Sequence, residues 1–422
     1  MFMKEFVGSE EILKKIPLLI KIKDENFLLS KNKDGIPILF SADCPHQHGI
    51  VNEIQNDCFR CPNHSWEFDL KSGRSLNAPQ SSLELFEIEN VNGELYVNLP
   101  DDEKTFKIHT TGKKIFPKIT LVSNACLLIE WEGINILTDP WIEGPAIYGC
   151  WVHYPPSTIK ISELPKIDFI FVTHEHSDHF NIQTLSKFNK NIPVYVPHFG
   201  NGRLAKRVKE LGFSKIITMP SGQIINLNEN IKSISFKTEN LWNDSIIYLQ
   251  LGNFKMLNIN DAGFNWKIPK IIGEVDLVCS AFSYGATAYP TRWTHLDLNK
   301  KMKIMEEKNL GMLNMIKQVV EACKGKYFLP FANFNELGPI EMREIVKIQK
   351  KNTPKTVMSY FKKNKINSKV LDMFPGESWD GNIIYKREDH EKLFDRSLVI
   401  PFLEKNYNFH YNEKFTPSNF SI

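Results

Sequence analysis

The sequence lacks the features that mark membrane proteins and nucleic-acid-binding proteins. No apolar run approaches the ~18 uninterrupted residues that a membrane-spanning helix needs. The 52 basic residues are nearly balanced by 49 acidic residues, and the net charge of +3 is too small to indicate nucleic acid as a partner. The first residues, Met1–Phe6, lack the charged head and long apolar segment of a signal peptide. We therefore expect a cytoplasmic protein without a membrane span.

Cysteine is also scarce, and its spacing is irregular. The chain has 7 cysteines in 422 residues. An odd number without a regular pattern excludes the disulfide framework of a small secreted domain. Cys44 and Cys61 have histidines close by in the sequence, which favours a role as metal ligands.

The chain also lacks a flavin-binding or nicotinamide-binding fingerprint. A length of 422 residues with 42% hydrophobic content is enough for two or more domains, each with its own core. Redox chemistry in this chain would therefore take its electrons from an external donor.

Residues 1–105 are predicted to form a small all-β domain. Short apolar or alternating runs occur at Phe27–Leu29, Pro37–Phe40 and Glu94–Leu99, and glycines such as Gly93 separate them. Runs of this length between turn residues are typical of strands.

Two cysteine–histidine clusters lie inside this domain, with the pattern C-x-H, fourteen residues, then C-x-x-H. The first contains Cys44 and His46, and the second contains Cys61 and His64. A Cys₂His₂ zinc site is one interpretation, but a zinc finger places its cysteines together and its histidines together. Here each cysteine has its own histidine.

This pattern resembles the Rieske [2Fe–2S] signature. The resemblance implies that Cys44 and Cys61 bind one iron of the cluster and that His46 and His64 bind the other. A Rieske cluster transfers single electrons, which a hydrolase does not need. An electron relay in this chain therefore favours redox chemistry in the rest of it.

A second domain is expected over residues 115–345, after a polar linker. Apolar segments at 119–122, 125–131 and 135–141 read as successive strands, with Gly133 at a turn. Residues 182–189 and 202–211 have helical patterns. The alternation indicates helices packed over the faces of a β-sandwich.

The strongest motif of this domain is the heptad Thr173–His179, which leaves an apolar strand at Ile167–Val172. It contains three histidines and one aspartate, at His174, His176, Asp178 and His179. Imidazole and carboxylate together suit zinc or iron. The alternative is that Asp178 merely caps the following helix as an acid in its first turn.

The arrangement H-x-H-x-D-H resembles the metal signature of the metallo-β-lactamase superfamily. The resemblance implies an αββα fold in which Asp178 and Asp261 take catalytic as well as ligand roles. Asp261 follows the apolar strand Lys255–Ile259, and Asp139 at a strand end is a candidate partner for one histidine.

Two histidines usual in that superfamily are missing downstream. In place of the first, Glu239 is the expected ligand and His198 the alternative. In place of the second, Glu336 or Asn333 stands at the expected strand end. Carboxylates in place of imidazoles shift the preference of the site from zinc toward iron.

A Rieske module followed by a metallo-β-lactamase module resembles the CMP-N-acetylneuraminate hydroxylases. The strings Asp139–Ala146 and Leu329–Ala332 support this resemblance, and residues 346–422 then form a short C-terminal extension. The family implies hydroxylation of the N-acyl group of a nucleotide-activated sugar, using O₂ and one or two irons, with zinc possible. A ferredoxin or a cytochrome b5-like protein with its reductase would supply electrons, and Arg292 is the preferred contact for an anionic group of the substrate.

Two other functions fit parts of the sequence. A metal-dependent phosphodiesterase or phospholipase-like hydrolase is a common use of the second fold, in which the metal generates hydroxide. An electron-transfer or redox-sensing protein with an inactive second site would explain the missing histidines. Consumption of O₂ would distinguish the hydroxylase from both alternatives.

Overall fold

The computed structural model describes most of the chain. The described residues are 2–23, 25–45, 50–55, 57–62, 65–77, 81–100, 114–200, 202–238, 243–284 and 289–410. The chain divides into two compact units. Unit 1 is Met1–Lys107 with Thr238–Trp242 and Gly263–Gly273, and unit 2 contains the other residues. Helix α3 (Ile268–Ile272) thus belongs to unit 1.

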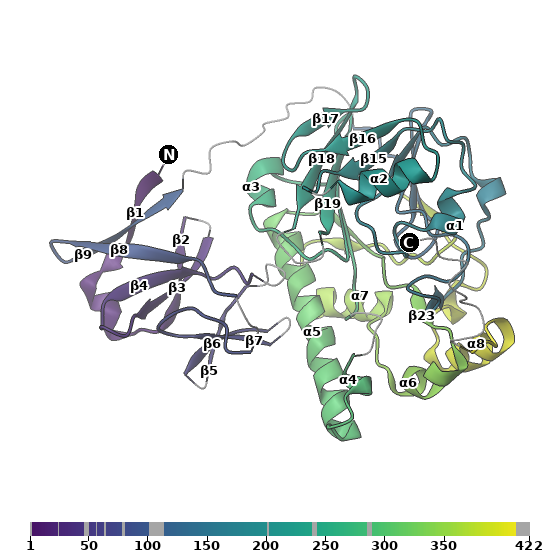
Figure 1. Cartoon of the computed structure of the whole chain (residues 1–422). Coiled ribbons are helices and arrows are strands. Elements are labelled where there is room, and N and C mark those ends of the chain that lie inside the picture. Colours follow the sequence, from purple (N-terminus) through teal and green to yellow (C-terminus); the bar gives the residue numbers. More distant parts are fainter. Residues whose placement is uncertain are drawn as a thin grey trace. The chain divides into compact units, whose positions relative to one another are not determined.

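Unit 1 is built on a six-stranded antiparallel sheet and a three-stranded sheet (Figure 1). The larger sheet has the order β1 (Phe2–Ser9), β9 (Glu94–Pro100), β8 (Leu85–Val91), β4 (Pro37–Ser41), β3 (Glu25–Lys31) and β2 (Leu18–Ile22). The smaller sheet contains β5 (Glu53–Gln55), β6 (Cys58–Cys61) and β7 (Trp66–Asp69). The predicted all-β first domain is confirmed.

The hairpin between β8 and β9 shows how local sequence sets the register of the larger sheet. Val91 pairs with Glu94, so only Asn92 and Gly93 form the loop. Both have positive φ, +54° and +86°. Asn-Gly is the favoured pair for such two-residue turns because both residues adopt this conformation at low cost.

Unit 2 contains two large mixed sheets. The first has the order β16 (Ile216–Met219), β15 (Val194–Pro197), β14 (Phe169–Phe171), β12 (Ile134–Thr138), β11 (Leu127–Trp131), β10 (Lys118–Leu121), β25 (Glu377–Trp379) and β26 (Ile384–Tyr385). The second has the order β17 (Ile224–Asn226), β18 (Ile231–Lys237), β19 (Ser245–Leu251), β20 (Phe254–Asn260), β21 (Leu277–Ser280), β22 (Tyr327–Pro330) and β24 (Lys369–Val370). A separate pair joins β13 (Trp151–His153) to β23 (Asn335–Leu337). Every residue of β19 is buried, which explains its continuous apolar pattern.

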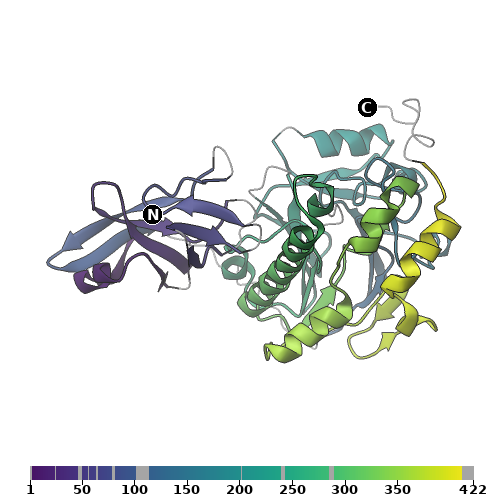
Figure 2. The same ribbon diagram turned by 90° about the horizontal axis from the view of Figure 1, so that it is seen from below.

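The helices of unit 2 flank these sheets. The helix α2 (Arg203–Glu210) packs on β15 and β16, whereas α1 (Ile182–Leu185) is a single turn in which the side chain of Asn181 accepts a hydrogen bond from the Thr184 amide. The helices α5 (Leu298–Ala322), α6 (Arg343–Ile348), α7 (Pro354–Lys363) and α8 (Val399–Asn406) lie on one side of the unit, below the sheets in Figure 1 and toward the viewer in Figure 2. The short α4 (Tyr289–Arg292) precedes α5. The predicted helix at 202–211 is confirmed, and the one at 182–189 is shorter than expected.

The residues after 345 complete both sheets of unit 2. The strand β24 pairs with β22, and β25 pairs with β10. Glu377 at the start of β25 is fully buried, and its carboxylate accepts hydrogen bonds from the amides of Phe374 and Arg387, both at 2.9 Å. This part of the chain is therefore integrated into the core of unit 2. Among the described residues, no helix is both long and apolar enough to cross a membrane.

Candidate metal centre

The heptad predicted to bind metal lies at one edge of the first sheet of unit 2. The strands β12 and β14 run parallel, so their carboxyl ends meet at the same edge. Asp139 follows β12, and Thr173 and His174 follow β14. The amide of Asp139 donates to the carbonyl of Phe171 at 2.8 Å, which holds the two chain segments together. The predicted strand and metal loop are thus in the expected order.

The second sheet brings two aspartates to this edge. Asp261 follows β20 and Asp244 precedes β19, and because these strands are antiparallel neighbours, the two ends coincide. The side-chain amide of Asn260 donates to the carbonyl of Ser245 at 2.9 Å, and Ser245 Oγ donates to the carbonyl of Thr173 at 2.7 Å. These bonds connect the second sheet to the metal loop.

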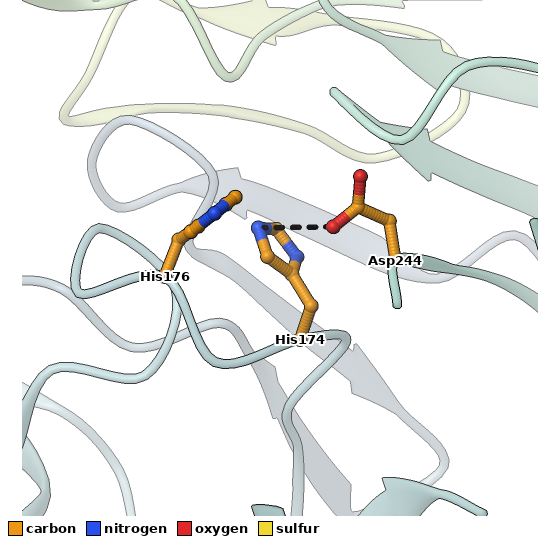
Figure 3. Close-up of side chains that lie close together, drawn as sticks. All are labelled: His174, His176 and Asp244. Carbon is orange, nitrogen blue, oxygen red and sulfur yellow. Dashed lines mark ion pairs between the residues drawn. The ribbon is translucent and has the colours of Figure 1, made fainter. Parts of the chain in front are cut away.

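The side chains converge in two groups that share one histidine. The first is His174, His176 and Asp244, shown in Figure 3, and the second is His174, His179 and Asp261. In each group, the candidate ligand atoms lie within 4.8 Å of one another. His174 Nε2 lies 3.9 Å from Asp244 Oδ1 and 3.9 Å from Asp261 Oδ1. A cation between these atoms would have imidazole and carboxylate ligands.

Asp178 lies beside the second group. Its Oδ2 is 3.4 Å from His179 Nε2, and Asp261 Oδ1 is 3.3 Å from the same nitrogen. Asp178 is buried, whereas the side chain of Asp261 is 33% exposed. The group is therefore accessible from the side of Asp261.

Asp139 orients both buried histidines. Its Oδ2 accepts from Thr173 Oγ1 at 2.8 Å and from His179 Nδ1 at 3.0 Å, and its Oδ1 accepts from the Thr173 amide at 2.8 Å. Asp139 adopts a φ of +43°, which few residues other than glycine tolerate, although aspartate is among those that do. The predicted role of Asp139 as a partner of a histidine agrees with this geometry.

The hydrogen bonds also determine which nitrogen of each ring carries a proton. A carboxylate only accepts, so Thr173 Oγ1 donates to Asp139 and accepts from Nδ1–H of His174, 3.1 Å away. By the same reasoning His179 Nδ1 donates to Asp139. The Nε2 atom of His174 then presents a lone pair, Nε2 of His179 presents one when that ring is neutral, and neither buried atom has a hydrogen-bond partner among the described residues. Buried acceptors that converge with carboxylates fit a bound cation.

The local charges agree with this arrangement. Burial, reinforced by the neighbouring imidazole of His179, lowers the pKa of His174 to about 3. Burial also opposes protonation of His179, but the carboxylates of Asp261, Asp178 and Asp139 raise its pKa well above the ordinary value. For Asp261, burial opposes ionisation, and the imidazoles, His179 first, hold its pKa well below its usual range. A metal cation would replace the proton of His179 as the partner of these carboxylates.

Several predicted site residues lie outside the described part of the chain. These are His46 and His64 of the first domain and Glu239 of the second, and of Arg292 only the backbone in α4 is described. Cys44 and Cys61 are described: both are buried in one apolar cluster with Phe40, Phe59 and Phe68. The two cysteines of the predicted cluster thus share one environment.

Asp244 is the site residue that sequence reasoning missed. It lies beside His174 and His176 in the first group, whereas Glu239 lies outside the described residues. The only signal in the sequence was its position immediately before the apolar run Ser245–Leu251. The contact depends on the antiparallel pairing of β19 with β20, which local sequence does not reveal.

The other candidate ligands make their side-chain contacts outside the two metal groups. Glu336 is buried and pairs with Arg396 and, at 3.4 Å, with Lys351. The side-chain oxygen of Asn333 accepts from the amides of Phe282 and Ser283. The structure therefore does not bring Glu336 or Asn333 into either metal group, and His198 is exposed on the surface.

Comparison with known proteins identifies both domains. A model of the Rieske [2Fe–2S] domain matches residues 4–87, and a model of the β-lactamase superfamily domain matches residues 134–309. The chain joins a Rieske domain to a β-lactamase superfamily domain. The predicted fold class, an all-β Rieske domain followed by a metallo-β-lactamase fold, is confirmed.

Curated relatives extend the similarity over most of this two-domain chain. It is 24% identical over 403 residues to the cytidine monophosphate-N-acetylneuraminic acid hydroxylase of Danio rerio, covering 88% of this chain and 67% of the relative. The enzymes of the same name from Xenopus laevis and Mus musculus are 25% and 24% identical, and the matches cover 74% and 82% of this chain. The chain spans only 56% and 62% of the length of these two relatives. The resemblance predicted from the motifs is confirmed.

Solved structures give more distant matches to this Rieske and β-lactamase superfamily chain. A metallo hydrolase from Ignicoccus hospitalis is 13% identical with a TM-score of 0.43, covering 64% of this chain and 99% of that one. The diiron β-hydroxylase CmlA from Streptomyces venezuelae is 18% identical with a TM-score of 0.37, covering 53% of this chain and 46% of that one.

Proposed function

We propose that the protein is an oxygen-dependent hydroxylase that acts on the N-acyl group of a nucleotide-activated sugar such as CMP-N-acetylneuraminate. The observation that carries the proposal is the cation site of unit 2 in a chain that also contains a Rieske domain. Its two converging Nε2 atoms have no hydrogen-bond partner among the described residues, and carboxylates surround them. The names of the curated relatives support the reaction and the substrate.

His174, His176 and Asp244 would hold one iron, and His179, Asp261 and Asp178 offer ligands for a second ion beside it. Imidazoles with several carboxylates suit iron in oxygenases. Iron bound here would supply the reaction with O₂ activation. Zinc in the same position would instead favour a hydrolase, as in other proteins of this fold.

The residues around this site would position its ligands and limit the access of water. Asp139 and Thr173 fix the two imidazole rings, and the fully buried Trp141 and Phe180 follow Asp139 and His179 closely in the chain. Asp261 is partly exposed, so the substrate would approach from its side. The role of Arg292 as a contact for an anionic group stays a prediction, as does the catalytic role of Asp178 and Asp261.

The Rieske domain would pass electrons singly to this reaction. Cys44 and Cys61 would hold one iron of the cluster, and His46 and His64 the other. The donor would be a ferredoxin or a cytochrome b5-like protein with its reductase. A cytoplasmic location stays a prediction from the cysteine pattern.

The test is metal and sulfide analysis with electron paramagnetic resonance on protein purified without oxygen. We expect a Rieske signal together with iron beyond that of the cluster. Reduced protein should then consume O₂ and add one oxygen atom to CMP-N-acetylneuraminate, as seen by mass spectrometry. Zinc in the second domain with no O₂ consumption would contradict the proposal and support the hydrolase.

Two variants separate the contributions of the two domains. The Cys61→Ser substitution should remove the Rieske signal and leave the iron of unit 2. The Asp244→Asn substitution should lower the iron of unit 2 and keep the Rieske signal, while Asp168→Asn, which changes a carboxylate that neither metal group contains, serves as the matched control. Equal iron in Asp244→Asn and the unchanged protein would show that Asp244 is not a ligand.

A further inference from the structure

A cavity of about 350 Å³ opens in unit 2. Pro145, His153 and Ser157 contribute to one wall, and Asn406, Tyr407 and Phe409 contribute to the other. None of the residues that line it carries a formal charge. The cavity thus combines flat apolar faces with a few neutral polar groups, which is typical of sites for small polar ligands.

His153 is the unusual residue of this cavity. It is only 7% exposed, and neither of its ring nitrogens has a hydrogen-bond partner among the described residues. Its ring lies against Trp141, with the ring centroids 3.9 Å apart. A buried polar group without partners costs roughly 1–3 kcal/mol, so a native protein seldom keeps one without a reason.

The charge state of His153 indicates the kind of partner it lacks. Burial lowers its pKa to about 3, although the carboxylate of Asp178 acts in the opposite direction. The ring is therefore neutral near pH 7 and offers one N–H donor and one nitrogen acceptor. A matching ligand group has both an acceptor and a donor, as an amide or a hydroxyl does.

The cavity is connected to the metal loop through short contacts. Trp141, against which His153 packs, lies two residues after Asp139, and its Nε1 donates to the carbonyl of Gly144 at 2.8 Å. The amide of Ile147 donates to Ser177 Oγ of the metal loop at 2.6 Å. The chain segment that forms one wall of the cavity is therefore bonded to the metal loop.

We propose that this cavity binds the neutral, hydroxyl- and amide-bearing sugar portion of the substrate, with His153 as its polar anchor. The inference rests on the proposed function and deepens it. A sugar ring has apolar C–H faces that pack on proline and aromatic side chains, and its hydroxyl groups both donate and accept hydrogen bonds. Phosphate and carboxylate groups lack a cationic partner in this lining, so they would bind elsewhere.

The test compares His153→Phe with His198→Gln, a control that removes an exposed imidazole. Calorimetry would measure binding of N-acetylmannosamine, of CMP and of CMP-N-acetylneuraminate. Phenylalanine keeps a flat ring against Trp141 but has no nitrogen. We expect His153→Phe to weaken binding of N-acetylmannosamine and CMP-N-acetylneuraminate about tenfold or more, to leave binding of CMP unchanged and to raise the melting temperature.

A second variant tests whether a loss of binding in His153→Phe comes only from a disturbed fold around position 153. Asn406→Trp, at the exposed end of α8, fills the cavity from the opposite wall and should also weaken binding of N-acetylmannosamine. Equal affinities for N-acetylmannosamine in the unchanged protein, His153→Phe and Asn406→Trp would overturn the inference. So would an unchanged protein that binds neither sugar, which would mean that ordered water is the partner of His153.

The outcomes separate this inference from the proposed function. Hydroxylation of CMP-N-acetylneuraminate with the same KM in His153→Phe would leave the function standing and overturn the sugar site. Binding of N-acetylmannosamine that depends on His153, without any hydroxylation, would support the sugar site and contradict the hydroxylase.

Discussion

Buried histidines occur in three environments in unit 2, and they differ in how many ring nitrogens have hydrogen-bond partners. Both nitrogens of His390 are bonded, Nδ1 to Glu377 Oε1 at 2.6 Å and Nε2 to Asp372 Oδ2 at 3.0 Å. His174 and His179 each have one bonded nitrogen, and His153 has none among the described residues. A fully bonded ring stabilises the fold, whereas an unused nitrogen is available to a ligand. The same residue type therefore serves structure in one region and binding in another.

The largest expected effect comes from removing the histidine shared by the two metal groups. The His174→Ala substitution should remove the most tightly held ion of unit 2, because both groups contain this side chain, and leave only the weaker ligand set of Asp178, His179 and Asp261. Metal analysis should show a clear loss of the iron beyond the cluster, with the Rieske signal unchanged. The control is His198→Ala, which removes an exposed imidazole. Unchanged iron in His174→Ala would contradict the proposed centre.

Changing the hydrogen-bond partner of His390 should have the opposite effect: stability should fall and the metal content should stay the same. The Glu377→Gln substitution weakens the buried hydrogen bond with His390 and places an amide N–H where the backbone amides of Phe374 and Arg387 need an acceptor, so the free energy of unfolding should fall by about 2 kcal/mol. Urea denaturation followed by the fluorescence of the buried Trp379 would measure this loss. Metal content should not change. A loss of metal with an unchanged free energy of unfolding would show that Glu377 and His390 serve metal binding rather than the stability of the fold.

A smaller effect is expected from the residue that orients the metal-binding rings. The Asp139→Asn substitution keeps the shape of the side chain but offers an amide where Thr173 and His179 need an acceptor. Loss of such a partner typically lowers metal affinity about 10-fold to 100-fold. Competition with a chelator would measure the affinity, and Asp168→Asn, at the start of the neighbouring strand, is the matched control. Equal metal affinities in Asp139→Asn and the unchanged protein would mean that Asp139 does not affect metal binding by the two imidazole rings.

The smallest effect concerns acid stability around His390. Burial opposes ionisation of Asp372, but its hydrogen bonds with His390 and Lys386 hold its pKa below the ordinary value. The carboxylate therefore stabilises the folded state above its unfolded pKa of about 3.9, and this contribution disappears as the pH falls through the lower folded value. The difference in urea midpoint between the unchanged protein and Asp372→Asn should shrink as the pH is lowered to about 3. A difference in urea midpoint that stays constant between neutral pH and pH ~3 would contradict this role of the Asp372 carboxylate.

The sequence predicted those parts of the molecule in which the information is local. The heptad Thr173–His179 and the two cysteine–histidine clusters are continuous motifs, and Asp139 and Asp261 were recognisable because each follows an apolar strand. Asp244 was missed because its approach to His174 depends on strand pairing and on the bond from Ser245 to Thr173. The cavity could not be predicted either, because its walls come from chain segments about 250 residues apart.

The carboxyl-terminal part shows a second limit of local patterns. The strands β24, β25 and β26 contain only 2, 3 and 2 residues, which is too short for an alternating pattern to appear. Their place in the sheets follows from tertiary packing around buried side chains such as Glu377 and Trp379. A Lys-rich tail in the sequence is thus an integral part of unit 2.

The sharing of His174 between the two groups has a consequence for how metal ions load. Its Nε2 can coordinate only one ion at a time, so the two groups compete for it. A titration should therefore show one tightly held ion first and a second, weaker ion that relies on Asp178, His179 and Asp261. The protein would act as a single-occupancy site at low iron supply and reach double occupancy only when iron is plentiful.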